Sequence, residues 1–328
     1  GRAGSDTLSY TGNTTARSVT LTGLGLVDGF TGAASGLVND FTNIDALLGG
    51  NAQDTLTALD AESTWTITGA NSALYTRGNS LAVIAFDILV GSFENDTLTF
   101  ATSGHATLTD LGPVDGFNVT EAGFTGEFHN INTIIGGPGA DSLTGFDSVA
   151  LWAVTTTNAG AYTSTRELTF SNVETLVGGT DDDTLTFAAF STSRNITITA
   201  VGAVDGFNIT EATFIGEFQN INILIGGTDS DTLTGLNADA TWTISGEYAG
   251  EYAASGFTNV LTFSTIEVLV GGSADDTITF AATGDVTLLN AGTVDGFDLT
   301  DTVFNGQLRN INTMLGTVGE DSLTGLST

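Results

Sequence analysis

The chain has 328 residues, of which 41% are hydrophobic, enough to bury a substantial core. Its formal net charge is −32, from 38 acidic residues against six Arg and no Lys, which excludes nucleic acid as a partner because binding phosphates requires clustered basic side chains. There is no Cys, so disulfides and thiolate metal sites are excluded. No run of 18 apolar residues is present, and we expect no membrane insertion within this segment.

Short strands are the elements that the sequence predicts. Residues 64–68, 106–109 and 195–199 alternate apolar side chains with Thr, the period of a strand with one buried face. No long segment has the 3.6-residue apolar period of an amphipathic helix. The predicted class is all-β.

A short motif, Asp-Thr/Ser-Leu/Ile, recurs along the chain at spacings of 42 to 48 residues. Its aspartates are Asp6, Asp54, Asp96, Asp141, Asp183, Asp231, Asp276 and Asp321. A Gly stands five residues before each Asp, and apolar residues stand two and five positions before that Gly. This pattern predicts a strand, a sharp bend and another strand in every repeat. The repeats form one continuous array over 1–328, with predicted boundaries at 1–48, 49–90, 91–135, 136–177, 178–225, 226–270, 271–315 and a partial repeat at 316–328.

Two types of repeat alternate, so the full unit is about 90 residues. One type carries Val-Asp-Gly-Phe, beginning at Val27, Val114, Val204 and Val294. The other type carries a Trp eleven residues after its Asp and a Tyr ten residues later: Trp65 and Tyr75, Trp152 and Tyr162, Trp242 and Tyr252.

A repeat of such short strands has to stack on its neighbours to bury its apolar face. We therefore predict a parallel β-solenoid (β-helix) with one coil per repeat of about 45 residues. Alternatives are two coils of about 22 residues per repeat, or an array of separate β-sandwich domains, although no linker-like stretch separates the units. The three Trp should share a column that skips alternate coils. The first model also predicts one buried column made of Leu56, Leu98, Leu143, Leu185, Leu233, Ile278 and Leu323.

Residues 170–186 resemble segments of giant bacterial surface proteins with haemolysin-type (RTX) repeats, whose nonapeptide is G-G-x-G-x-D-x-L-x. Residues 136–143 match that pattern at every fixed position, whereas Asp181 and Asp229 replace the third Gly in two other copies. The resemblance covers about a fifth of the chain, because there is one such motif per repeat. It implies a secreted bacterial protein, extracellular or on the cell surface, similar in style to filamentous adhesins and calcium-loaded in its turns.

The motif aspartates are the candidate metal ligands, because stacked carboxylates repel one another and hard cations prefer oxygen ligands. Asp141, Asp183 and Asp231 are the first candidates for Ca²⁺, Asp181 and Asp229 add charge beside them, and Asp276, Asp54 and Asp96 complete the set. The competing interpretation is that each Asp accepts hydrogen bonds from turn amides and so fixes the bend.

Two other polar sets predict ladders. An Asn six residues before the turn Gly, at Asn43, Asn130, Asn172, Asn220 and Asn310, should stack and bond its neighbours. Thr55/Thr57, Thr97/Thr99, Thr184/Thr186, Thr232/Thr234 and Thr277/Thr279 should form two hydroxyl rows. Such rows resemble those of ice-binding proteins, although Thr also simply favours strands.

We expect that the chain is not an enzyme and has no catalytic residues, because His105 and His129 occur in one repeat only and no nucleophile–base motif is present. The predicted function is an extracellular structural or adhesive repeat protein that forms a rigid rod, filament or stalk. The alternative is a calcium-stabilised adhesin module that binds ice or glycan. Both ends fall inside the repeat pattern, so we expect a longer polypeptide or a polymer, with partners being further copies end to end or other surface proteins.

Overall fold

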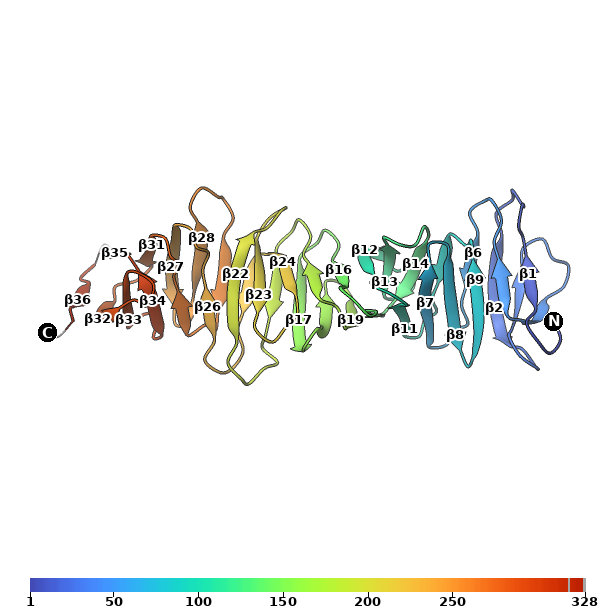
Figure 1. Ribbon diagram of the computed structural model, residues 1–328, viewed down its shortest axis with the longest axis horizontal. Helices are drawn as coiled ribbons and strands as arrows, with labels where there is room; N and C mark the ends of the chain where they lie inside the picture. The colour runs from blue at the N-terminus through green and yellow to red at the C-terminus, as the bar shows by residue number, and fades with distance from the viewer. Residues whose placement is uncertain (318, 327–328) are drawn as a thin grey trace. The chain divides into compact units, whose positions relative to one another are not determined.

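A computed structural model describes residues 1–317 and 319–326 of the chain. The described residues form 36 short strands and no helix (Figure 1), so the predicted all-β class is confirmed. Accordingly, no described helix has the length and apolar character needed to span a membrane. The chain divides into two compact units, an N-terminal unit (1–146 with 162–173) and a C-terminal unit (147–161 with 174–328).

The strands of the N-terminal unit are three to seven residues long. They are β1 (Thr7–Ser9), β2 (Ser18–Leu24), β3 (Phe30–Ala34), β4 (Phe41–Ile44), β5 (Ala46–Leu48), β6 (Thr55–Thr57), β7 (Ser63–Gly69), β8 (Ser72–Arg77), β9 (Asn79–Ile84), β10 (Ile88–Val90), β11 (Asp96–Phe100), β12 (His105–Leu111), β13 (Phe117–Glu121), β14 (Glu127–Ile131), β15 (Thr133–Ile135), β16 (Ser142–Thr144) and β19 (Glu167–Ser171). Strand β18 (Ala159–Thr163) crosses the division between the units.

The C-terminal unit repeats the same kinds of strand. They are β17 (Ala150–Thr156), β20 (Thr175–Val177), β21 (Asp183–Thr186), β22 (Asn195–Val201), β23 (Phe207–Glu211), β24 (Glu217–Ile221), β25 (Ile223–Ile225), β26 (Thr232–Thr234), β27 (Ala240–Gly246), β28 (Ala249–Ala254), β29 (Leu261–Ser264), β30 (Val268–Val270), β31 (Asp276–Phe280), β32 (Asp285–Ala291), β33 (Phe297–Asp301), β34 (Gln307–Ile311), β35 (Thr313–Leu315) and β36 (Ser322–Thr324).

In the N-terminal unit the strands form two sheets. The first sheet runs in the order β1-β5-β9-β8-β7-β11-β15-β19. The second runs in the order β4-β3-β2-β6-β10-β14-β13-β12-β16. The chain passes from one sheet to the other and back, and strands one turn apart pair in parallel. The predicted parallel β-solenoid is therefore confirmed.

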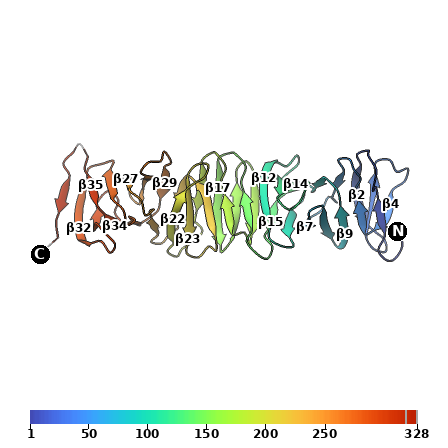
Figure 2. The same ribbon diagram turned by 45° about the horizontal axis from the view of Figure 1, so that its top comes forward.

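The C-terminal unit has the same two sheets. Its first sheet runs β17-β21-β25-β29-β28-β27-β31-β35. Its second runs β20-β24-β23-β22-β26-β30-β34-β33-β32-β36. Strands β22 and β23 lie side by side in both views (Figure 1 and Figure 2).

Three-stranded antiparallel meanders interrupt the parallel order, and the sequence did not predict them. The Trp-type repeat places its meander in the first sheet, as in β7-β8-β9, and the Val-Asp-Gly-Phe repeat places its meander in the second, as in β12-β13-β14. The Gly of Val-Asp-Gly-Phe makes the turn: Gly116 has φ +47°, and a Cβ there would lie 2.4 Å from the carbonyl oxygen of Ile131. Only glycine fits this left-handed, crowded position.

The meanders make the predicted coil length wrong: a turn takes about 36 residues rather than 45. Between one motif strand and the next the chain crosses between the sheets three times, for example from β6 through β7-β8-β9 and β10 to β11. Because three is odd, successive motif strands lie in opposite sheets.

The predicted single leucine column is wrong for the same reason. Leu56 pairs with Val19 and Leu89 in the second sheet, whereas Leu98 pairs with Trp65 and Ile134 in the first. Each sheet has its own buried column, built from motif leucines and from residues of the intervening strands.

The tryptophans do share a column in the C-terminal unit. The register connects Trp152 to Phe263 through Leu185 and Leu224, and the Phe263 ring contacts the Trp242 ring with centroids 6.0 Å apart; all five side chains are buried. The Trp242 and Tyr252 rings contact each other across β27 and β28 in a T-shaped arrangement, with centroids 4.6 Å apart. Such aromatic pairs add about 0.5–1.5 kcal/mol beyond the burial of their area. The Trp–Tyr spacing of ten residues is therefore the signature of this hairpin.

Candidate functional site

We define an aspartate turn as the six residues from a turn Gly to the motif Asp that follows it. Each aspartate turn after the first carries the chain from a strand of one sheet to a strand of the other. Six of the eight motif aspartates are almost entirely inaccessible to solvent: Asp54, Asp96, Asp183, Asp231 and Asp276 are 0% exposed and Asp141 is 1% exposed, whereas Asp6 is half-buried and Asp321 is exposed. A carboxylate in such a place has to be hydrogen-bonded or neutralised, because burying an unpaired charge costs several kcal/mol.

In five of these six carboxylates, one oxygen closes its own turn. The Oδ2 atom accepts a hydrogen bond from the backbone N–H four residues earlier. The donor is Gly50 for Asp54 (2.5 Å) and Gly272 for Asp276 (2.7 Å). The same bond joins Ser92 to Asp96, Gly179 to Asp183 and Gly227 to Asp231. These bonds support the interpretation in which the aspartate fixes the bend.

The other oxygen accepts a hydrogen bond from the neighbouring turn of the solenoid. The kind of donor depends on the sheet to which the strand after the aspartate belongs. For aspartates that start strands of the second sheet the donor is a backbone N–H: that of Arg17 for Asp54 (2.7 Å) and of Arg194 for Asp231 (2.6 Å). Asp141 accepts in the same way from Gly104 N (2.5 Å).

For aspartates of the first sheet the donor is a side chain. The Oδ1 atom of Asp96 accepts from the Ser63 hydroxyl, and the Oδ1 atom of Asp276 accepts from the indole Nε1–H of Trp242 at 3.2 Å. Asp183 interacts likewise with Trp152. Trp152 and Trp242 thus support buried carboxylates as well as filling the core.

A third contact uses the backbone N–H of the motif Asp, and sequence reasoning missed it. This N–H donates to a side-chain oxygen on the next turn: Asp87 for Asp54 (2.7 Å), Asn132 for Asp96 (3.0 Å) and Glu267 for Asp231 (2.7 Å). The signal was present, because the residue four before each turn Gly is always Asp, Asn or Glu. These residues are Asp45, Asp87, Asn132, Glu174, Asn222, Glu267 and Asn312.

The predicted asparagine ladder is wrong. Asn130 has φ +59°, a left-handed conformation that Asn tolerates better than most residues. Its Oδ1 accepts from Val114 N at 3.2 Å, and its Nδ2 donates to Gly91 O at 3.1 Å. Asn43, Asn220 and Asn310 repeat both bonds. These amides therefore lock turns to one another through the backbone and not through other amides.

Burial shapes the electrostatics of the first-sheet turns. Desolvation raises the pKa of Asp183 to about 7, against hydrogen bonds from Gly179 and Trp152, and the nearby charge of Asp205 adds to the rise. Desolvation likewise raises the pKa of Asp276 to about 6, and Asp295 contributes.

The second carboxylate of each first-sheet site comes from Val-Asp-Gly-Phe. The Oδ2 atoms of Asp115, Asp205 and Asp295 accept from the amides of Asn132, Asn222 and Asn312 at 3.0, 3.0 and 3.1 Å. Their Oδ1 atoms are buried and have no hydrogen-bond partner within the described part of the chain.

The predicted calcium ligands form a donor set that fits the metal poorly. The buried oxygens of Asp54, Asp231 and Asp276 face N–H donors, whereas Ca²⁺ requires six to eight oxygen ligands. Asp181 and Asp229 are exposed in their turns. Within residues 1–317 and 319–326, no three acidic or His side chains gather closely enough to hold a metal ion. Calcium binding stays a prediction.

The predicted threonine sets do not lie on one face, because Thr55 and Thr57 belong to the second sheet and Thr97 and Thr99 to the first. Another row exists in the first sheet of the N-terminal unit, where Thr64, Thr97, Thr133 and Thr169 are register neighbours. The hydroxyls of Thr133 and Thr169 bond each other at 2.9 Å.

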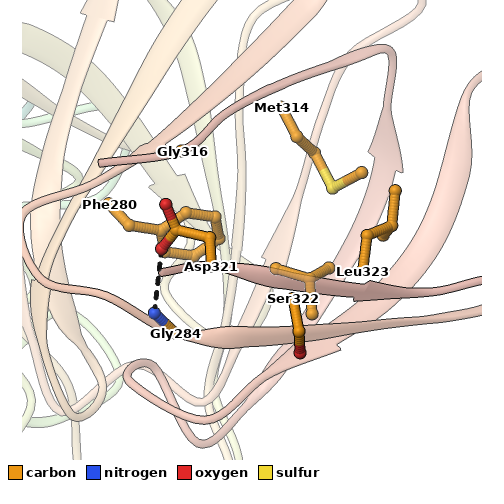
Figure 3. Close-up of a pocket in the computed structure, with 8 residues that line it drawn as sticks. Phe280, Gly284, Met314, Gly316, Asp321, Ser322 and Leu323 are labelled. Carbon is orange, nitrogen blue, oxygen red and sulfur yellow. Dashed lines mark hydrogen bonds between the residues drawn. The ribbon is translucent and has the colours of Figure 1, made fainter. Parts of the chain in front are cut away.

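The described end of the C-terminal unit has a small apolar pocket of about 190 Å³ between β35 and β36. Met314 and Leu323 line it from these two strands, and Asp321 accepts a hydrogen bond from Gly284 N at 3.2 Å (Figure 3). The two histidines lie elsewhere: His105 contacts the Ser142 hydroxyl (2.9 Å) and His129 contacts Glu127 (3.1 Å). The pocket residues do not form a nucleophile–base pair.

No family model, curated protein or solved structure matches the chain. Interpretation of the function therefore depends on the geometry of the turns and sheets.

Proposed function

We propose that the chain is a structural repeat protein, an extended scaffold or stalk on an extracellular or bacterial surface, with an adhesive rather than a catalytic role. The observation that carries the proposal is that the buried carboxylates of Asp54, Asp96, Asp231 and Asp276 each bond both their own turn and the neighbouring turn. A side chain engaged in this way is occupied in holding the fold and is not free for chemistry.

The packing supports the same function. Parallel strands bond one another from turn to turn within each unit, and stacked repeats gain stability from each additional neighbour. The inward residues of each sheet are buried aliphatic and aromatic side chains. The excess of acidic residues keeps such a surface soluble and suits an exported protein.

Small-angle X-ray scattering tests the proposed scaffold. A compact chain of this length would have a radius of gyration of about 20 Å. We expect a value clearly above this at neutral pH, with a maximum dimension several times the cross-section. A radius near that of a compact chain would contradict the proposal.

Self-association through strand edges forms part of the proposal. Leu315 and Leu323 on β35 and β36 are 52% and 60% exposed, and open strand edges invite pairing with a second copy. Sedimentation over a hundredfold concentration range should show growth of the sedimentation coefficient, which Leu323→Asp should reduce. A chain that stays monomeric throughout would defeat this part of the proposal and leave the scaffold itself standing.

A further inference from the structure

One hairpin of the C-terminal unit departs from the repeat. In the N-terminal unit, β8 and β9 are joined through Gly78 alone, with Arg77 and Asn79 paired across the turn. Gly78 there lies against the Leu24 side chain of β2. The corresponding hairpin, β28-β29, has six residues between its strands, 255–260. Repeat symmetry is broken by an insertion whose Phe257 is 56% exposed.

Phe257 of the inserted loop forms one wall of a groove of about 710 Å³ in the C-terminal unit. The other walls are β22 and the segment after β26, and the lining includes Thr199, Val201, Gly235 and Ala238. The lining is mainly apolar. This insertion therefore creates a surface that the short hairpin of the other unit does not build.

The floor of the groove is an open strand edge. Strand β26 pairs with β22 only from Asn195 to Thr197. The chain then turns away, and Gly235 N bonds Val270 O of the next strand at 2.9 Å. On this side β22 has no partner strand beyond Thr197 among the described residues. Its free backbone groups can bond an added strand.

Acidic residues lie beside the groove. Glu217 accepts a hydrogen bond from the Thr199 hydroxyl at 2.9 Å, and Asp239 follows Ala238 directly along the chain. Asp205 lies in the turn between β22 and β23. Asn259 of the inserted loop contacts this turn, because its Nδ2 donates a hydrogen bond to Gly206 O at 2.9 Å. The C-terminal unit has only two Arg to offset this charge.

Neither arginine neutralises the groove. Arg194 is buried, with its guanidinium over the Phe190 ring and beside Glu211. Arg309 donates to Gln307 on β34. A ligand for the groove must therefore supply its own positive charge.

We propose that this groove binds an extended, basic peptide segment of a partner protein, which adds as a strand to the free edge of β22. Alternate side chains of such a strand point to opposite faces. Apolar side chains on one face pack against Phe257 and Val201, and Lys or Arg side chains reach Glu217 and Asp239. This site is independent of the scaffold role, which does not require it.

Selection of a displayed library of random dodecapeptides on the intact 328-residue chain tests the proposal. We expect enriched peptides to alternate basic and apolar residues, and their affinity to fall as salt rises because the attraction is electrostatic. Phe257→Ala should weaken the binding of a selected peptide about tenfold or more. Failure to enrich any peptide, or enrichment of acidic ones, would overturn the proposal.

A loop replacement supplies the structural control. Replacing residues 255–258 by a single Gly leaves five residues between Tyr252 and Leu261, as between the paired Tyr75 and Leu81 of the β8-β9 hairpin. It also keeps Asn259, so the variant should fold and melt normally while losing peptide binding. Phe93→Ala removes another exposed phenylalanine, which is 72% exposed and lies in the N-terminal unit, and should leave binding unchanged. Binding that survives the loop replacement, or is lost in Phe93→Ala, would show that the groove is not the site.

Discussion

The aspartate turns of the two sheets have one sequence motif and two chemical environments. In the second sheet, Asp54 and Asp231 receive two backbone N–H donors each. In the first sheet, Asp276 receives one backbone donor and an indole, and a second carboxylate, Asp295, raises its pKa. Backbone donors are fixed by the fold, whereas side-chain donors and carboxylate neighbours are set by individual residues. The first-sheet turns should therefore respond more strongly to pH and to conservative substitution, although burial also raises the pKa of Asp231 in the second sheet.

The largest effect should come from deleting a second-sheet carboxylate. Asp231→Ala leaves two buried N–H groups, of Arg194 and Gly227, without an acceptor. At about 1–3 kcal/mol for each of the two unsatisfied buried groups, the free energy of unfolding should fall by about 2–6 kcal/mol in chemical denaturation. Asp229→Ala, at an exposed position in the same turn, is the control and should unfold like the parent chain. Equal losses in the two variants would contradict the structural role.

Most of the pH dependence should come from the first sheet, where the pKa shifts are largest. Because burial raises the pKa of Asp183 to about 7 and of Asp276 to about 6, the folded state binds these protons more tightly than the unfolded state. Their contribution to stability is complete below pH about 4 and is lost as the pH rises through 6 and 7. The free energy of unfolding should fall by about 2 kcal/mol between pH 5 and pH 8, after allowance for partial screening. A chain that is more stable at pH 8 than at pH 5 would contradict this.

Tryptophan substitutions compare two first-sheet turns directly. Trp242→Phe keeps a ring against Tyr252 but removes the Nε1–H donor of Asp276. Trp65 occupies the same place in the N-terminal unit, but its buried Nε1 has no hydrogen-bond partner among the described residues. The Ser63 hydroxyl donates the corresponding hydrogen bond to Asp96 instead. Trp242→Phe should therefore cost about 1–2 kcal/mol more than Trp65→Phe in denaturation experiments. Equal costs would show that the indole bond contributes nothing.

Removing the second carboxylate should have a smaller and opposite effect. Asp205 raises the pKa of Asp183, and its Oδ1 has no described partner. Asp205→Asn keeps an oxygen for the Asn222 amide and removes the charge, so it should stabilise the chain at pH 8 by about 0.5–1 kcal/mol, within the usual range for single substitutions. At pH 5 the gain should largely disappear. A loss of stability at pH 8 would mean that the two carboxylates do not repel each other.

The sequence predicted the fold class because the repeat forces stacking, but it did not predict the path of the chain. A motif at a period of 45 residues is compatible with one sheet or two, and only the pairing of Trp65 with Tyr75 within a hairpin decides how many times the chain crosses. The asparagine ladder was wrong because a left-handed backbone at Asn130 directs the amide to neighbouring turns. The polar residue four positions before each turn Gly was visible in the sequence, yet its acceptor role requires the register of adjacent turns.

The same limit applied to the aspartates. Their recurrence showed that something must offset the stacked charge, but calcium and backbone amides satisfy that requirement equally well at the level of sequence. The distance from Asp231 Oδ1 to Arg194 N, 2.6 Å, joins residues 37 positions apart. No local pattern encodes that contact.

Thermal melting of the chain in excess chelator and in millimolar calcium tests the central claim, that amides rather than cations hold the buried aspartates. A cation that binds only the folded turns would stabilise them by mass action and raise the melting temperature. We predict that the two melting curves coincide at pH 7.5, and that Asp141→Ala is destabilised equally in both solutions. A rise of several degrees in calcium, lost in Asp141→Ala, would show that the turns are metal sites and would contradict the account.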